Sequence, residues 1–299
     1  MGELKNQRSQ PLDTAHQKLP KFIYTPESNL KHPIRLFKIM ARDLLASREL
    51  AWQLMVRDIN AQYRQSFLGI FWAFVPPIVT AVGLTFAKNA NIVNLEETDL
   101  PYPAYVMFSM SLWQTFTEAL NSPLQEVSSA SGMLAKINFP REALILAGLG
   151  KVFFNFGIKL ILILGLFIYF QMPVTWSVLL APVALIHLVM LGTAIGLLLA
   201  PIGTLYQDIP KLLTLALGFW LLLTPVVYSV PQKGGLASTL VQLNPVTPLL
   251  VTTRELATTG VISQPQGFWL VSCITMVGLL MAWLFYRLAM PFIVERMSA

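Results

Sequence analysis

The stretch that decides the fold is residues 143–170, which read ALILAGLGKVFFNFGIKLILILGLFIYF. Its only charged side chains are Lys151 and Lys159. An α-helix rises 1.5 Å per residue, so about 20 residues cross the roughly 30 Å hydrocarbon core of a bilayer. This stretch is longer and continuous, whereas strands of a membrane barrel alternate over about ten residues. It therefore predicts a transmembrane helix, and the chain is expected to be an all-α integral membrane protein.

The composition of the whole chain agrees with this expectation. Of its 299 residues, 55% are hydrophobic and 12% are charged, against about 25% charged in an average soluble domain. The single cysteine, Cys273, excludes an intramolecular disulfide and any Cys-x-x-Cys site. An ordinary soluble domain is therefore excluded.

A window of about 19 residues identifies further apolar stretches. The predicted spans, six in all, are residues 67–87, 103–121, 143–170, 176–200, 212–230 and 268–286. The second is the most polar, since it contains Gln114 and Glu118, so it would span only with its polar face against protein or water. Residues 236–253 are interrupted by Asn244 and two prolines. They predict a re-entrant segment between helices 5 and 6, with a cavity or pore mouth on the outer side.

Basic residues predict the orientation. Residues 1–66 hold 11 basic and 6 acidic side chains. Outside the predicted spans, the later inner segments hold five basic residues and the outer loops hold three, Lys88, Lys233 and Arg254. The first outer loop is also acidic, with Glu96, Glu97 and Asp99. The positive-inside rule then places both termini in the cytoplasm. No signal peptide is expected, because residues 1–33 contain no apolar core, and the excess charge marks a membrane face, with no nucleic-acid partner expected.

Four regions are expected along the chain. Residues 1–32 are a flexible cytoplasmic tail, 33–66 an amphipathic interface helix region, 67–290 the six-helix membrane domain and 291–299 a cytoplasmic tail. Apolar and basic residues alternate at helical spacing from Pro33 to Arg64, which suits one helix or a broken pair lying on membrane lipids. A soluble helix packed on a partner protein is the alternative.

The sequence predicts no catalytic residue and no metal site. The three histidines are His16, His32 and His187, and there is no HExxH or GxSxG motif. Gly150-Lys151 is followed by Val152, where a phosphate-binding loop needs Ser or Thr. Residues 231–267 are shorter than a small domain of about 50 residues. If transport is ATP-driven, a separate polypeptide must supply the nucleotide site.

Charges inside a span indicate a transport path. Lys159 lies near the middle of the 143–170 span and is expected to face a watery conduit or to pair with Glu118. Lys151 can snorkel to the headgroups. The predicted spans contain no Asp, and Glu118 is their only acid, which argues against proton or sodium coupling.

Five motifs occur in order along the chain. They are Arg57-Asp58 with Tyr63-Arg64-Gln65-Ser66, Leu68-Gly69 and Trp72 running into Pro76; Phe139-Pro140-Arg141-Glu142; Asp208-Ile209-Pro210; Trp220 with Thr224-Pro225 and Tyr228; and Asn244-Pro245. Together they resemble type-2 ATP-binding-cassette exporter permeases that move polysaccharides and polyol phosphates. The resemblance covers about residues 50–290, and the polar N-terminal tail departs from it.

The resemblance implies roles for these residues. The coupling segments, Phe139 to Glu142 and Asp208-Ile209-Pro210, would contact the ATPase, with Phe139 as an apolar anchor and Arg141 as a charged contact. The hinge at the membrane entrance would comprise Arg57, Asp58, Tyr63, Arg64, Leu68 and Gly69. Two copies would enclose a channel, whose candidate lining residues are Tyr105, Phe108, Trp113, Phe116, Glu118, Phe153, Phe154, Lys159, Trp220 and Tyr228. Packing alone also explains each aromatic.

The resulting prediction is the permease subunit of an ATP-driven exporter of lipid-linked polysaccharide, such as O-antigen or capsule, in the bacterial inner membrane. The chain itself would not be an enzyme and would not bind a cofactor. It would form a homodimer with two ATPase subunits, which hold ATP and Mg. Alternatives are export of teichoic acid, lipid or drugs, an autonomous channel or ion-coupled carrier, and a membrane glycosyltransferase or acyltransferase.

Overall fold

The computed structural model describes residues 33–64, 69–90, 98, 100–134, 136–137, 139–230 and 235–298. Within these residues all regular secondary structure is helical, as predicted. The chain divides into residues 1–39 and residues 40–299, and the packing reported below is within the second unit. The predictions for the tail 1–32, for Leu68 and for the acidic loop at Glu96, Glu97 and Asp99 lie outside the described residues.

The interface region is a broken pair of helices. Helix α1 covers Pro33–Ala46 and α2 covers Arg48–Arg64. The intervening Ser47 donates from its hydroxyl to the carbonyl of Asp43. Helix α2 buries Ala51 and Leu54 against the bundle.

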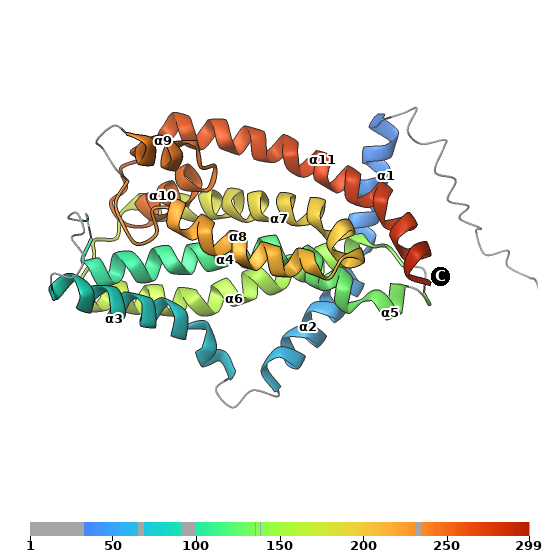
Figure 1. The fold of residues 1–299 in the computed structure, drawn as a ribbon, viewed down its shortest axis with the longest axis horizontal. Coiled ribbons are helices and arrows are strands. Elements are labelled where there is room, and N and C mark those ends of the chain that lie inside the picture. Colours follow the sequence, from blue (N-terminus) through green and yellow to red (C-terminus); the bar gives the residue numbers. More distant parts are fainter. Residues whose placement is uncertain are drawn as a thin grey trace, which may run out of the picture. The chain divides into compact units, whose positions relative to one another are not determined.

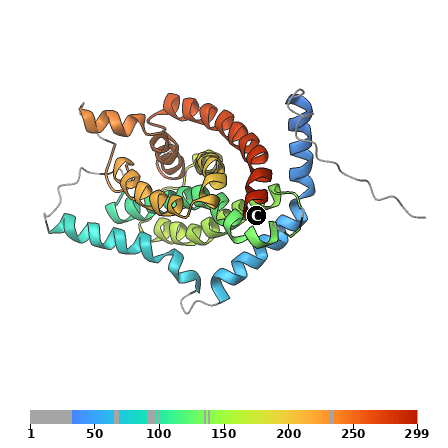
Figure 2. The ribbon, with the colours of Figure 1, turned by 45° about the vertical axis from the view of Figure 1, so that its right-hand side comes forward.

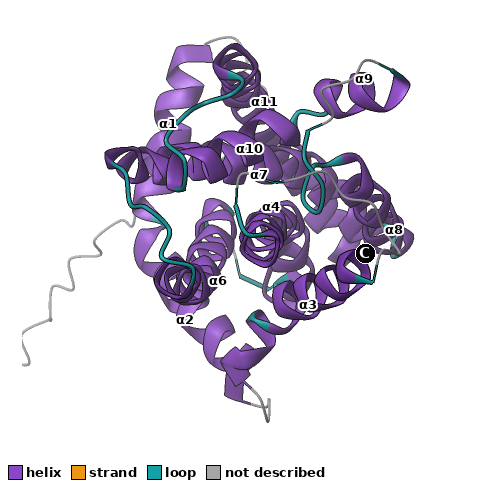
Figure 3. Ribbon diagram, turned by 90° about the vertical axis from the view of Figure 1, so that its left-hand side faces the viewer, coloured by secondary structure: helices purple, strands orange, loops and turns teal. Residues whose placement is uncertain are grey.

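Helix α4, Tyr102–Ser129, lies in the middle of the bundle (Figure 3). It packs against α3 (Val75–Asn89), α6 (Glu142–Tyr169) and α7 (Ala181–Leu205). The long α11, Pro265–Ser298, runs beside α7 (Figures 1 and 2). The hydroxyls of Ser111 and Thr115 are buried and donate to carbonyls one turn earlier in α4. These two hydroxyls of α4 thus find partners inside protein, as expected for part of the polar face of this segment.

Two glycines allow α7 to approach α4 closely. A Cβ atom on Gly192 would lie 2.7 Å from the carbonyl oxygen of Phe116, and one on Gly196 would meet the carbonyl of Leu120 and the ring of Pro123. Small residues four positions apart let helix backbones meet in this way. The α4–α7 contact therefore depends on the absence of side chains at these two positions.

Three of the helical segments are long and apolar enough to cross a membrane, within the described part of the chain. They are Glu142–Tyr169, Trp176–Leu205 and Pro265–Arg296, which agree with the predicted spans 143–170, 176–200 and 268–286. The second comprises the short 3-10 helix η3, Trp176–Leu180, and α7. Helix α4 is long enough but not apolar enough.

The predicted first and fifth spans are shorter as helices than expected. The first is split into η2, Gly69–Ala73, and the 15-residue α3. The fifth is α8, Asp208–Leu223, which has 16 residues. Its predicted continuation to Val230 is wrong, because Pro225 disfavours a helical conformation at Thr224, which is extended. The total of six spans stays a prediction.

The segment before α11 contains two short helices, α9 (Leu236–Leu243) and α10 (Val246–Ala257), with Asn244 and Pro245 between them. Helix α10 is buried along most of its length and packs on α7 and α11. The break at Asn244-Pro245 agrees with the sequence, and whether this segment re-enters a bilayer stays a prediction.

We call the end of the bundle that carries α9 the α9 end (Figure 1). The opposite side is the α5 end, named after α5, Ser131–Leu134.

Candidate functional site

The first predicted coupling segment lies between α5 and α6. Phe139 and Pro140 are not helical, as expected for a residue pair of this type. Phe139 is half-buried and packs on the cluster around Leu144 and Tyr286. Pro140 is exposed, Arg141 is half-buried and Glu142 is buried. Pro140 and part of Arg141 are therefore the accessible portion of this motif.

The second segment opens α8 at the same end of the bundle. Gly203, near the end of α7, lies beside two side chains. They are Leu124, near the end of α4, and Ile209, in the first turn of α8. The side chain of Asp208 is 84% exposed, and Lys211 Nζ lies 3.6 Å from its Oδ1. An ion pair this exposed contributes little stability. The α5 end thus presents the exposed first turn of α8, with Asp208 and Pro210, together with the exposed Pro140.

Arg287 of α11 connects this end to the interface helices. Its Nη1 donates to Glu142 Oε1 at 2.6 Å and its Nη2 donates to Asp43 Oδ2 at 2.5 Å. The three side chains are 17%, 7% and 22% exposed, in the order Arg287, Glu142, Asp43. A guanidinium presents several donors in a rigid plane, so it can hold two carboxylates at once. We call this group the Arg287 node. The sequence did not identify Asp43 or Arg287 as a site residue.

Two ion pairs link α4 to α6. Lys159 Nζ donates to Glu118 Oε1 at 2.5 Å, and Lys151 Nζ donates to Glu126 Oε1 at 2.6 Å. The two acids are eight residues apart on α4 and the two lysines are eight apart on α6, so an antiparallel pairing satisfies both. The pairing of Lys159 with Glu118 confirms one of the two predicted outcomes. Lys151 has a nearly buried partner within protein, Glu126, and its snorkelling to the headgroups stays a prediction.

Tyr63 extends this polar system to the predicted hinge. Its hydroxyl donates to Asn155 Oδ1 at 3.0 Å, and Asn155 Nδ2 donates to Glu118 Oε2 at 3.2 Å. Burial, and next the Glu118 carboxylate, raises the pKa of the Tyr63 phenol, so its hydroxyl stays protonated and donates. A chain of hydrogen bonds therefore joins α2 to α6 and α4.

The hinge residues differ in their surroundings. Arg57 Nε donates to Asp58 Oδ1 at 2.8 Å. The Arg57 side chain is 53% exposed and that of Asp58 19%, and Arg64 is exposed. Gly69 has φ +47°, in the left-handed region that glycine adopts at low cost. The conformation of Gly69 supports the predicted turn at the membrane entrance.

A cavity of about 470 Å³ lies beside this hinge. It is bounded by α2, η2, α3, α4 and α6, and we call it the α2–α6 cavity. Its polar walls come from Gln62, Tyr63, Gln114, Glu118, Asn155 and Lys159, and its other walls include Trp72 and Pro76. The structure thus brings two predicted channel residues, Glu118 and Lys159, and two predicted hinge residues, Tyr63 and Gly69, to one cavity.

The aromatic channel candidates fall into two groups. One is enclosed within the subunit: Phe116 contacts Trp113 and Trp220 at centroid distances of 5.4 and 5.5 Å. Tyr105 and Phe108 are buried in the same cluster. The other group is Phe153 and Phe154, which are 42% and 40% exposed. An enclosed side chain reaches a channel only if helices separate, so the lining role of the first group stays a prediction.

Near the α9 end, Asn244 connects α8 to the α9–α10 turn. Its Oδ1 accepts from Trp220 Nε1 at 2.9 Å and from Val246 N at 3.0 Å, and its Nδ2 donates to Thr224 Oγ1 at 2.9 Å. Tyr228 accepts at its carbonyl from the Tyr105 hydroxyl at 2.7 Å. The motif residues Trp220, Thr224 and Asn244 therefore form one hydrogen-bonded unit.

Arg254 of α10 is a buried cation that the sequence did not single out. It lies 4.0 Å from the centroid of the Tyr105 ring and donates to Ser109 Oγ at 2.8 Å. Aromatic faces stabilise a guanidinium. Its contacts fix α10 to α4.

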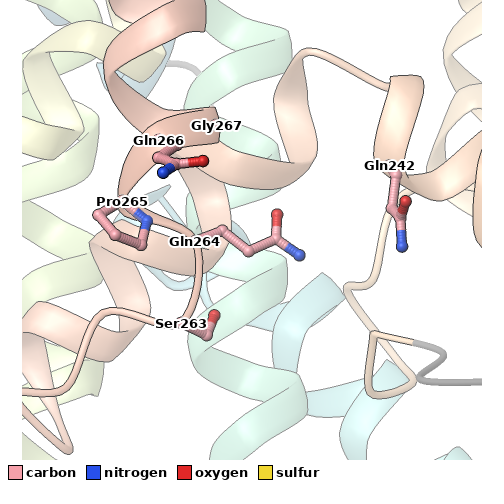
Figure 4. Close-up of a pocket in the computed structure, with 6 residues that line it drawn as sticks. All are labelled: Gln242, Ser263, Gln264, Pro265, Gln266 and Gly267. Carbon is pink, nitrogen blue, oxygen red and sulfur yellow. The ribbon is translucent and has the colours of Figure 1, made fainter.

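A second cavity, of about 480 Å³, lies at the α9 end between α9 and the start of α11 (Figure 4). It is lined by Gln242, Ser263, Gln264, Pro265, Gln266 and Gly267. Figure 4 shows the amide groups of Gln242 and Gln264 on opposite sides of this space. A hollow at this place agrees with the cavity expected beside residues 236–253.

Comparison with known proteins gives a consistent result. A family model described as ABC-2 type transporter matches residues 49–258. The chain is 29% identical over 219 residues to an O-antigen export system permease protein RfbA of Myxococcus xanthus, which covers 71% of this chain and 81% of that protein. It is 21% identical over 215 residues to a protein of the same name from Klebsiella pneumoniae, covering 69% and 79% of the two chains.

Proposed function

The chain belongs to the family of ABC-2 type transporters, and on that basis we propose that it is the permease subunit of an ATP-driven exporter of lipid-linked polysaccharide. The observation that carries the proposal is the family match over residues 49–258, together with relatives named as O-antigen export permeases that align with about 70% of the chain. The export family predicted from the five motifs is thereby confirmed. An O-antigen-like polymer is the substrate we infer.

The proposed location is the bacterial inner membrane, with six spans and both termini in the cytoplasm. The three long apolar helices support a membrane location. Lys136, Arg141 and Arg287 lie at or near the α5 end, and the positive-inside rule then assigns this end to the cytoplasm. The re-entrant position of α9 and α10 on the outer side belongs to the same proposal.

Two copies of the chain would act with two separate ATPase subunits, which bind ATP and Mg. The accessible residues at the α5 end, Pro140 and Asp208, support a docking surface for the ATPase there. Glu142 starts α6 and is held by the Arg287 node. A push on this segment would therefore reach α6 and the interface helices together, and would open the path between the two copies.

The experiment that tests this function is deletion of the gene, followed by complementation. We expect the deletion strain to lose surface polysaccharide and to accumulate lipid-linked polymer on the cytoplasmic side, and the full-length gene to restore export. In proteoliposomes, transport should require the ATPase partner and ATP. Transport by the purified chain alone would instead show a channel or an ion-coupled carrier.

A further inference from the structure

We propose that the α2–α6 cavity binds a neutral sugar ring of the exported polymer. This inference rests on the proposed function and adds a substrate site to it. The volume of the α2–α6 cavity, about 470 Å³, lies within the range of about 300–1,000 Å³ that is typical of small-molecule sites. Three properties of its walls decide which ligand fits: their charge, their unused hydrogen-bonding groups and their aromatic surface.

The charge of the walls balances. Among the described residues that line the cavity, the ionisable groups charged at neutral pH are Glu118 and Lys159, and they neutralise each other at 2.5 Å. The Lys159 side chain is 1% exposed. An anion such as a diphosphate would have to displace Glu118 from Lys159, and a cation would have to displace Lys159 from Glu118. Both are unfavourable, so an uncharged ligand fits best.

Two amide groups on the walls have no hydrogen-bond partner within the described part of the chain. The side chains of Gln62 and Gln114 make no hydrogen bond to the described residues, although each amide has two donor hydrogens and an acceptor oxygen. Gln114 is half-buried on α4, where an unsatisfied polar group is costly. Beside them, Glu118 and Asn155 are held in place by the hydrogen bonds from Lys159 and Tyr63. Two amides with unused donors and acceptors, beside two polar groups that are held in place, match the several hydroxyls of a sugar.

Trp72 supplies the aromatic surface. Its side chain is 56% exposed and lines the cavity with Pro76. The C–H face of a sugar ring packs on an indole, while its hydroxyls reach the polar side of the cavity. The ligand would thus touch η2 and α3 on one side and α4 and α6 on the other. Because Gly69 and Tyr63 of the hinge also line the cavity, an occupied site would hold α2 and α3 in one arrangement.

The test uses the purified full-length chain in lipid nanodiscs and saturation-transfer difference NMR. The probes are the methyl glycosides of D-mannose, D-galactose, L-rhamnose and N-acetyl-D-glucosamine, each at millimolar concentration. We expect at least one to bind. Its affinity should fall about tenfold in Gln114→Leu, through the loss of one amide, and likewise in Trp72→Ala. The matched control is Gln242→Leu, which removes an exposed amide from the cavity at the α9 end and should leave binding unchanged.

Three outcomes would overturn the inference. They are binding of none of the four glycosides, binding that neither Gln114→Leu nor Trp72→Ala weakens, and competition by inorganic pyrophosphate that depends on Lys159. The gene deletion described above separates this inference from the proposed function. If the deletion abolishes export and no glycoside binds, only the sugar site is wrong. If glycosides bind and export survives the deletion, the proposed function is wrong.

Discussion

Lys159 and Glu118 form an ion pair between the two central helices α6 and α4, with Nζ 2.5 Å from Oε1. The lysine side chain is 1% exposed and the glutamate side chain 32%. Desolvating a lysine is costly unless an acid lies beside it. Glu118 therefore allows Lys159 to remain charged although its side chain is almost fully buried.

The substitution Glu118→Gln should destabilise the protein by about 2 kcal/mol, less than the 3–5 kcal/mol of fully buried pairs because Glu118 is partly exposed. Thermal unfolding of the purified protein measures this. The double variant Glu118→Gln, Lys159→Met should lose less than the two single variants added together, since neither charge is left alone. If the stability loss of the double variant equalled the sum of the two single losses, the ion pair would make no contribution to stability.

Arg287→Ala should be among the most damaging changes at the α5 end, because it leaves Asp43 and Glu142 without their shared cation. We expect a loss of about 3 kcal/mol in the free energy of unfolding. Arg287→Lys should recover only part of this, since an ammonium cannot hold two carboxylates as a guanidinium does. Arg296→Ala is the control, an exposed arginine on the same helix. Equal melting temperatures of Arg287→Ala and Arg296→Ala would refute the structural role of the node.

Gly196→Leu should separate α7 from α4, because its Cβ meets the carbonyl of Leu120 and the ring of Pro123. A backbone carbonyl in a helix cannot move aside, and overpacking of this kind costs about 3 kcal/mol. Size-exclusion chromatography of the detergent-solubilised protein should show a lower yield of the monodisperse species. The control Gly278→Leu lies on α11 with open space around it and should behave as wild type. A normal yield for Gly196→Leu would contradict the close α4–α7 contact.

Asp208→Lys should weaken association with the ATPase subunit about tenfold by reversing a charge in the proposed docking surface. Its melting temperature should hardly change, because an exposed substitution alters stability by at most about 0.5 kcal/mol. Arg141→Glu, in the coupling segment from Phe139 to Glu142, should likewise weaken association with the ATPase subunit. Co-purification with the tagged ATPase measures both, and Gln266→Lys at the α9 end is the matched control. Unchanged co-purification of both coupling variants would remove the docking assignment.

The sequence predicts the helices that depend on local composition. The length of the apolar run predicts α6 to within one residue at each end, and the break at Phe139-Pro140 follows from proline alone. Gly69, predicted as a joint, has the backbone angle that only glycine adopts readily. The end of α8 was missed because hydropathy continues past Pro225, whereas the helix does not.

The contacts between distant residues were harder to predict. Helical periodicity shows which residues share a face, but it does not show which helix that face meets. Asp43 and Arg287 therefore gave no signal, because 244 residues separate them and no repeated spacing of charges connects them. The pair Glu126 and Lys151 did carry a signal, because the spacing from Glu118 to Glu126 equals that from Lys151 to Lys159. Two helices predicted to be antiparallel and to share that spacing suggest both pairs at once.

The Arg287 node also constrains the order of events during biosynthesis. Asp43 and Glu142 leave the ribosome long before Arg287, which follows them by 244 and 145 residues. Since domains form as their residues emerge, the two carboxylates must wait, unpaired, while the intervening helices insert. We expect nascent chains stalled before residue 287 to be cut by protease near α1 and α5, and chains stalled well beyond the C terminus to resist. The last helix to be made thus closes the face that we propose as the docking surface for the ATPase, and we expect incomplete chains to be poor partners for it.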